Sequence, residues 1–174
     1  MIWFAVLIGL VACERLAELV VAKRNRDIAL AQGGIEAGQG HYPVMVALHT
    51  GLLGGALAEV YLLDRPFHPV LGPVMLAVVI AAQGLRWWCI RTLGAQWNTR
   101  IIVVPGLRRI AAGPYRWLRH PNYLAVVAEG VALPLVHSAW LTAVVFTALN
   151  LPLLWHRIQV EERAMRVLVG SPAP

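Results

Sequence analysis

Long apolar stretches separated by short polar segments dominate the chain. Apolar residues run with few interruptions through residues 2–22, 42–63, 69–90, 122–136 and 140–155. A helix needs roughly 20 mostly apolar residues to cross a hydrocarbon core about 30 Å thick. The first three stretches reach that length, and the fourth is short. The pattern predicts an all-α, polytopic membrane protein with about five transmembrane helices, forming one domain over residues 1–174.

Polar and turn-forming residues set the expected ends of these helices. The first stretch stops at Lys23, and a polar loop is expected to follow as far as Gly40. The second and third stretches are joined by a short link after Asp64, so they are expected to form a helical hairpin. The N-terminus lacks a basic region ahead of its apolar residues, so it is expected to be a first span and not a removable signal.

Residues 91–121 form the longest segment that is not expected to cross the membrane. Arginines are scattered here among turn-forming glycines and prolines. Basic residues also follow the first stretch and fill the C-terminal tail, whereas the opposite side has only Arg65, balanced by Asp64. By the positive-inside rule we expect the N-terminus outside, and residues 91–121 and the tail in the cytoplasm.

The composition excludes several classes of protein. Hydrophobic residues make up 59% of the chain and charged residues only 14%, which is too apolar for a soluble domain of this size. The formal charge of +6 is common in proteins that bind nucleic acid, but here the basic residues lie beside apolar segments, so no nucleic-acid partner is expected. Cysteines and histidines show no metal-ligand spacing, and no metal site is expected.

The first apolar stretch contains three charged residues, Glu14, Arg15 and Glu18. A charge at the centre of a membrane helix costs about 2.5 kcal/mol or more, so each needs a partner or a use. Glu14 and Glu18 are four residues apart and share a helix face. They are expected either to fix the bundle through hydrogen bonds and ion pairs or to line a substrate pocket.

Two histidines, His41 and His49, lie at the start of the second stretch and within it. Their spacing of eight residues places them roughly on one helix face. Three interpretations stay open: satisfied buried histidines, contact with a substrate, or a metal site, which would need a further ligand. Glu59 and Glu129 are interpreted as structural residues.

The segment 113–123 carries the clearest chemical signal. Gly113, Pro114 and Pro121 set two rigid bends around aromatic and basic side chains at the expected membrane face. Such breaks are tolerated at membrane depth where they line a cavity. Arg157 and Glu161, one helical turn apart, would offer opposite charges to that cavity from the end of the last span. The alternative is a basic membrane-anchoring loop with an exposed salt bridge.

The C-terminal half resembles the isoprenylcysteine carboxyl methyltransferases and their bacterial membrane relatives. The resemblance covers residues 92–165 and rests on three elements in order: residues 113–115, residues 119–123 and the pair Glu161 and Glu162. In the N-terminal half, residues 14–18, 23–25 and 41–43 are similar to a bacterial subgroup associated with type III polyketide synthases, whose members methylate long-chain alkylpyrones or related phenolics.

The resemblance implies an S-adenosylmethionine-dependent methyltransferase without a Rossmann fold, whose cofactor pocket faces the cytoplasm of a bacterial inner membrane. Arg157 falls at the family's substrate-contacting arginine, and Arg157 and Glu161 are the expected catalytic residues. Arg100 and Leu107 depart from the residues found in relatives. The positions implied to bind the cofactor are Arg100, Leu107, Arg108, Arg109, Ile110, Tyr115, His120, Pro121, Asn122, Tyr123 and Glu161.

The implied reaction is O-methylation of a lipophilic acceptor that enters from the bilayer. The acceptor is a carboxylate, or an enol or phenol of a long-chain polyketide such as an alkylpyrone, and a polyketide synthase is the expected upstream partner. Arg157, Glu14, Glu18 and His49 are the expected substrate contacts. Two other functions stay open: an NAD(P)H-dependent membrane reductase, which shares the Arg-His-Pro-x-Tyr element, and a non-catalytic membrane subunit or transporter.

Overall fold

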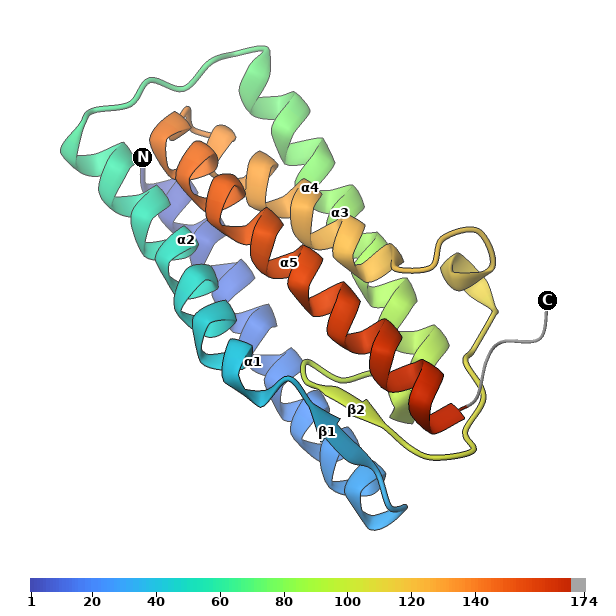
Figure 1. Cartoon of the computed structure of the whole chain (residues 1–174). Helices are drawn as coiled ribbons and strands as arrows, with labels where there is room; N and C mark the ends of the chain where they lie inside the picture. Colours follow the sequence, from blue (N-terminus) through green and yellow to red (C-terminus); the bar gives the residue numbers. More distant parts are fainter. Residues whose placement is uncertain (170–174) are drawn as a thin grey trace.

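The computed structural model describes residues 1–169, and Figure 1 shows them as a bundle of long helices. The helices are α1 (Ile2–Ala31), α2 (Tyr42–Leu62), α3 (Leu71–Leu93), α4 (Pro121–Leu135) and α5 (Trp140–Val169). Short 3₁₀ turns lie between them: η1 (Gln39–His41), η2 (Gly94–Gln96) and η3 (Gly113–Arg116). Each of the five apolar stretches is therefore helical, as the sequence predicted.

Helix α1 is longer than its apolar stretch, and the segment that follows it is not a simple loop. The helix continues past the predicted end at residue 22 to Ala31, because charged residues limit a membrane span without stopping a helix. Gly33, at φ 80°, then turns the chain. Strand β1 (Ile35–Ala37) follows and pairs antiparallel with β2 (Ile101–Val103). This two-stranded sheet departs from the predicted all-α fold. The sequence did not predict it, because strands of three residues are too short to show an alternating pattern.

Among residues 1–169, three helical segments are long and apolar enough to cross a membrane: Gln39–Leu62, Leu71–Gln96 and Trp140–Leu168. Helix α4 has 15 residues, a length of about 22 Å, which is short of the roughly 30 Å hydrocarbon core. Helix α1 is long enough, but charged residues interrupt its apolar run. The chain is thus a helical membrane protein, and three of the five predicted spans meet these criteria.

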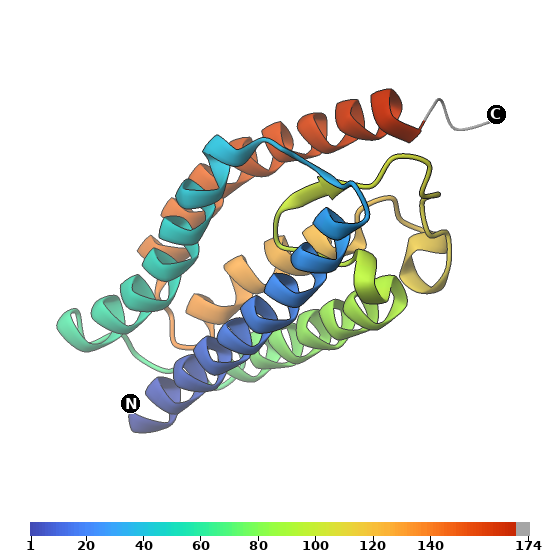
Figure 2. The same ribbon diagram turned by 90° about the horizontal axis from the view of Figure 1, so that it is seen from below.

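The helices form two layers, which the view in Figure 2 separates clearly. Helices α2 and α5 lie side by side in one layer, and α1, α3 and α4 form the other, with α4 also packed along α5. The end of the bundle near the N-terminus is closed by an apolar core that includes Phe4, Val60, Val79 and Leu133. At the opposite end the sheet and the connections around it lie between the layers.

Glu59, near the end of α2, fixes the start of α5. Its carboxylate accepts hydrogen bonds from the backbone N–H of Leu141 at 3.0 Å and of Thr142 at 2.7 Å, and from the Thr142 hydroxyl at 2.8 Å. Arg65 pairs with the same carboxylate at 2.9 Å. Since the first N–H groups of a helix have no intrahelical partner, Glu59 acts as a cap supplied by a neighbouring helix. This contact confirms its structural interpretation.

The basic segments meet at one end of the bundle. Figure 1 shows the C-terminal end of α1, the sheet, the connection from β2 to α4 and the last turns of α5 at the same end, opposite the N-terminus. Residues 91–121 and the charged part of α5 therefore share one face, as the charge distribution predicted.

Candidate active site

A cavity of about 850 Å³ lies between the two helical layers and extends into the basic end of the bundle. Its volume falls within the roughly 300–1,000 Å³ that small-molecule sites occupy. One end is polar and is lined by β2 and the connection from β2 to α4. The other end lies between α1, α2 and α5 and is lined mainly by apolar side chains, among them Leu16, Val46, Leu53 and Leu154.

The connection that lines the polar end is shaped by glycine and proline. Gly113 has φ 53°, and an added Cβ would collide with the Thr92 side chain, so this turn packs directly against α3. Pro121 then occupies the first turn of α4, where a missing N–H costs no hydrogen bond. Between them Tyr115 is half-buried against Cys89, and this burial raises the pKa of its phenol well above the ordinary value. Tyr115 therefore lines the cavity as a neutral side chain.

Arg157, Tyr123 and Glu161 form a connected polar cluster at the cavity wall. The Tyr123 hydroxyl donates to Glu161 Oε2 at 2.6 Å, and Arg157 Nε donates to the same hydroxyl at 3.2 Å. Tyr123 comes from α4, and the two charged residues come from successive turns of α5. The loop ahead of α4 and the charged end of α5 thus converge on one site, as the sequence predicted.

The second glutamate of the pair has a different partner. Glu162 Oε1 lies 3.0 Å from His120 Nε2 and 3.3 Å from Arg109 Nη1, and the other Arg109 amino group donates to the Arg119 carbonyl at 2.9 Å. The His120 ring stacks on the Tyr123 ring, with centroids 5.3 Å apart. His120 therefore contacts both glutamates, since its Nδ1 also lies 3.7 Å from Glu161.

Arg157 is buried, with an exposed fraction of 5%, and it forms no salt bridge within the part of the chain that the structure describes. Its amino groups donate to the Thr99 carbonyl and, at 3.2 Å, to the Met45 sulfur, which is a weak acceptor. A buried guanidinium without a carboxylate partner is costly. The site is therefore suited to an anionic oxygen supplied by a ligand.

Arg100 joins the sheet to α2 at the edge of the cavity. Its guanidinium pairs with Glu36 of β1 at 2.6 Å and lies over the Tyr42 ring, 4.1 Å from the centroid. Arg100 and Tyr42 both line the cavity. The pairing of β1 with β2 therefore places Arg100, which follows α3 in the chain, beside the start of α2.

The structure brings most of the predicted site residues to this cavity and leaves three out. Arg108, Pro121 and Glu14 are absent from its lining. The predicted residues that line the cavity are Glu18, His49, Arg100, Leu107, Arg109, Ile110, Tyr115, His120, Asn122, Tyr123, Arg157 and Glu161.

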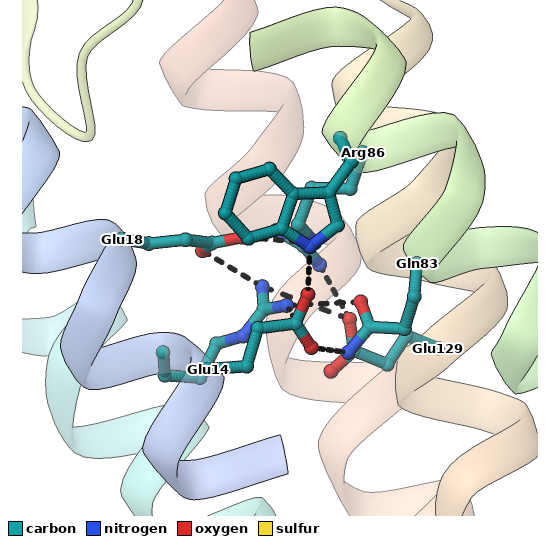
Figure 3. A network of polar contacts seen from close by, with 7 residues as sticks. Glu14, Glu18, Gln83, Arg86 and Glu129 are labelled. Atoms are coloured by element: carbon teal, nitrogen blue, oxygen red, sulfur yellow. Dashed lines mark hydrogen bonds and ion pairs between the residues drawn. The ribbon is translucent and has the colours of Figure 1, made fainter. Parts of the chain in front are cut away.

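Glu14 and Glu18 belong to a network of buried charges in the bundle, drawn in Figure 3. Arg15 lies 3.0 Å from Glu18 and 3.8 Å from Glu129, and Arg86 of α3 pairs with Glu129 of α4. The Glu14 carboxylate accepts hydrogen bonds from the side chains of Gln83 and Trp87. The network therefore ties α1, α3 and α4 together, and Glu129 is structural as interpreted.

Several cavity residues were not identified from the sequence. Arg86 and Asn150 are polar residues inside apolar stretches. A polar group in a membrane helix is costly, so the argument that drew attention to Glu14 and Glu18 applies to them as well. Met45 and Thr99 carry no such signal, because they contact Arg157 through a thioether and a backbone carbonyl. Trp97 and Asn98 are held by contacts that only the fold creates. Asn98 donates to the Ala22 carbonyl, and the Trp97 carbonyl accepts a hydrogen bond from Asn25.

Residues 1–169 contain no group of three or more histidine, cysteine, aspartate or glutamate side chains placed to hold a metal ion.

Comparison with known proteins identifies the family. Residues 75–167, which include α4, most of α3 and α5 and the connection between α3 and α4, match the isoprenylcysteine carboxyl methyltransferase family. The chain belongs to this family. Isoprenylcysteine carboxyl methyltransferase relatives are membrane-associated methyltransferases, and the matched range contains the Arg157, Tyr123 and Glu161 cluster.

Two bacterial relatives match almost the whole methyltransferase chain. The uncharacterized protein YpbQ of Bacillus subtilis (strain 168) is 38% identical over 164 residues, covering 94% of this chain and 96% of the relative. An uncharacterized protein of Haemophilus influenzae (strain ATCC 51907 / DSM 11121 / KW20 / Rd) is 25% identical over 166 residues, covering 95% and 96%. No solved structure matches the chain.

Proposed function

We propose that this methyltransferase uses S-adenosylmethionine to methylate an oxygen of a lipophilic acceptor that enters from the bilayer. The acceptor oxygen belongs to a carboxylate, or to an enol or phenol of a long-chain polyketide such as an alkylpyrone. The observation that carries the proposal is the buried Arg157, unpaired by any carboxylate of residues 1–169, in a cavity that joins a polar end to an apolar one.

The side chains at the polar end fit the cofactor. S-adenosylmethionine carries a carboxylate, an ammonium group, ribose hydroxyls and a polar base, so its site needs both donors and acceptors. At this end of the cavity, the buried acceptor Asn122 Oδ1 and the buried donor Trp97 Nε1 have no hydrogen-bond partner within residues 1–169. Buried polar atoms are normally paired. Together with Glu161 and Arg109, they supply the mixed donor set that such a ligand requires.

When bound, S-adenosylmethionine supplies an electrophilic methyl group on a sulfonium. In our proposal Glu161 accepts hydrogen bonds from the cofactor's ammonium group or ribose hydroxyls, and His120 and Tyr115 enclose it. Arg157 orients the acceptor oxygen as an anion, which a guanidinium does well because its N–H groups form a fixed fork. The chain contributes mainly alignment, since holding two reactants in line lowers the barrier without a strong general base.

The two ends of the cavity suit two different routes of entry. Arg109 and Arg119 line the polar end, and their exposed side chains give the cofactor access from water. Leu16 of α1 and Val46 of α2 line the apolar end, and they are also 63% and 41% exposed on the outside of the bundle. We therefore propose that the acceptor enters between α1 and α2 from the lipid, with the chain in a bacterial inner membrane and the C-terminus in the cytoplasm. A polyketide synthase is the proposed upstream partner.

The direct test is calorimetric titration of the purified protein with S-adenosylhomocysteine. We expect saturable binding that is lost in Glu161→Ala, while NADPH gives no signal. No heat at millimolar S-adenosylhomocysteine would contradict the proposal, and NADPH binding in its place would favour the reductase. If Glu14→Ala abolishes function while Arg157→Ala and Glu161→Ala leave it intact, the protein is a transporter or subunit. Untargeted lipid analysis of cells with and without the protein should reveal a product heavier by one methylene.

A further inference from the structure

Two polar side chains face the apolar end of the cavity from neighbouring helices. His49 lies on α2 and Asn150 on α5, and both line the cavity. The His49 ring packs edge-on against Phe146, with centroids 5.4 Å apart. Phe146 is four residues before Asn150, so the two share a face of α5. His49 and Asn150 therefore line the same part of the cavity from α2 and α5, about one helical turn apart along α5.

His49 has a fixed ring orientation. Its Nδ1 lies 2.8 Å from the Met45 carbonyl oxygen, which can only accept, so Nδ1 carries the hydrogen. With its hydrogen on Nδ1, the neutral imidazole leaves Nε2 as an acceptor, and the side chain lines the cavity. Within residues 1–169 no side chain or backbone group donates to that nitrogen.

Asn150 has unused hydrogen-bonding capacity. Its exposed fraction is 3%, yet its amide forms no side-chain hydrogen bond with any residue in the range 1–169. Inside a membrane bundle such a group is expensive and marks a functional position by default. The amide can both donate and accept, so it can complete the hydrogen bonding of a group that donates to His49.

The hydrogen bonding at this position determines which kind of group fits it. His49 Nε2 can only accept, so the group must carry a hydrogen. An ionised oxygen has no hydrogen to donate. The neutral group that donates to an imidazole and accepts from an amide is a hydroxyl.

Met45 links this position to the proposed reaction site. Its backbone carbonyl holds His49, and its sulfur contacts Arg157 at 3.2 Å. Met45 and His49 are four residues apart, so the subsite lies about one helical turn, ~6 Å, along α2 from the residue that contacts Arg157. A single ring with two oxygen substituents is the smallest ligand that suits this separation.

We propose that His49 and Asn150 form a binding subsite for an uncharged hydroxyl group of the lipophilic acceptor, separate from the oxygen that receives the methyl group. The hydroxyl donates to His49 Nε2 and accepts from the Asn150 amide. This inference rests on the proposed function, because it takes the bound ligand to be the methyl acceptor. The subsite selects acceptors that carry two oxygens on one ring over those that carry one.

The test compares two probes that differ only in the second hydroxyl, 5-pentadecylresorcinol and 3-pentadecylphenol. Their equilibrium binding is measured on the full-length protein in lipid nanodiscs without cofactor. We expect the resorcinol to bind about tenfold more tightly, which is the order expected for two neutral hydrogen bonds. His49→Phe and Asn150→Leu should each bring the two affinities to within about twofold. His156→Phe, the same change at an exposed histidine outside the cavity, should leave the preference intact.

Thermal unfolding and size-exclusion profiles verify that each variant is folded, and His49→Gln, which keeps an acceptor, should retain part of the preference. A wild-type protein that binds both probes equally, or neither, overturns the subsite, as does a preference that survives both His49→Phe and Asn150→Leu. These binding results do not involve S-adenosylmethionine. Failure of the protein to bind S-adenosylhomocysteine would therefore count against the proposed function alone.

Discussion

The Tyr123 hydroxyl stands between Glu161 and Arg157, donating to the carboxylate at 2.6 Å and accepting from the guanidinium Nε at 3.2 Å. The two charged residues are four apart on α5, so they would tend to pair directly. The tyrosine from α4 is inserted between them, and no direct ion pair joins them in the part of the chain that the structure describes. One neutral hydroxyl therefore orients a cation and an anion toward the same cavity.

Tyr123→Phe should weaken cofactor binding while leaving the fold intact. The change removes a hydrogen bond to a charged group on each side, and such bonds contribute about 1.5–3 kcal/mol. We expect S-adenosylhomocysteine affinity to fall about tenfold or more, measured by calorimetry. Tyr61→Phe removes a hydroxyl from an exposed tyrosine of α2 and should leave the affinity unchanged. Equal affinity in Tyr123→Phe and the wild type would show that the bridge does not position Glu161.

Arg157→Lys should strongly lower the rate of methyl transfer although it keeps the positive charge. Lysine keeps the positive charge but lacks the planar fork that reaches Tyr123, Met45 and Thr99 together. We expect kcat/KM for the acceptor to drop about 100-fold, with cofactor affinity changed much less. Arg163→Lys makes the same substitution at an exposed position of α5 and is the matched control. A variant as active as the control would remove Arg157 from the reaction.

The helices could be predicted from the sequence, but their full lengths could not. Apolar runs mark where lipid is favourable, so residues 42–63 and 69–90 nearly coincide with α2 and α3. In α1 and α5 the helix continues past the apolar run through charged residues, which are good helix formers but leave no hydropathy signal. The sheet is held by a register between two segments more than sixty positions apart, Ile35 opposite Val103, and no local pattern reveals it.

The site was predictable where function depends on side-chain type and not where it depends on packing. His120, Tyr123, Arg157 and Glu161 stand out as polar or aromatic residues at bends and helix ends, and the structure brings all four together. The sequence could not show that the two adjacent glutamates have different partners. Glu162 contacts His120, whereas Glu161 accepts a hydrogen bond from Tyr123. Consecutive helical residues point about 100° apart, so their partners depend on how α4 lies against α5.

Arg86 and Glu129 of the buried network should depend on each other for their contribution to stability. Both side chains are less than 10% exposed and pair with one another. Removing one partner of a buried pair leaves an uncompensated charge and costs about 3–5 kcal/mol. We therefore expect Arg86→Gln and Glu129→Gln each to lower the thermal unfolding temperature strongly, and the double variant to lose less than the sum of the two. Additive losses in this double-mutant cycle would mean that the two residues act independently.

Glu59→Gln should destabilise the bundle without changing ligand binding. The carboxylate receives three hydrogen bonds from the first turn of α5 and one ion pair from Arg65. Glutamine keeps one oxygen but loses the charge that the helix N-terminus favours, which together should cost about 1–3 kcal/mol. Thermal unfolding of the detergent-solubilised protein measures this loss.

Asp64→Asn is the matched control for that variant, because it removes a carboxylate from the exposed turn just after α2. Asp64 has φ 46°, a conformation that asparagine also adopts readily, so the backbone should be undisturbed. We expect its unfolding temperature to equal that of the wild type. S-adenosylhomocysteine affinity should be unchanged in both variants, because Glu59 lies at the end of the bundle away from Tyr123 and Glu161. If Glu59→Gln unfolds at the same temperature as Asp64→Asn, the first turn of α5 does not depend on a cap from α2, and its N–H groups must be satisfied in another way.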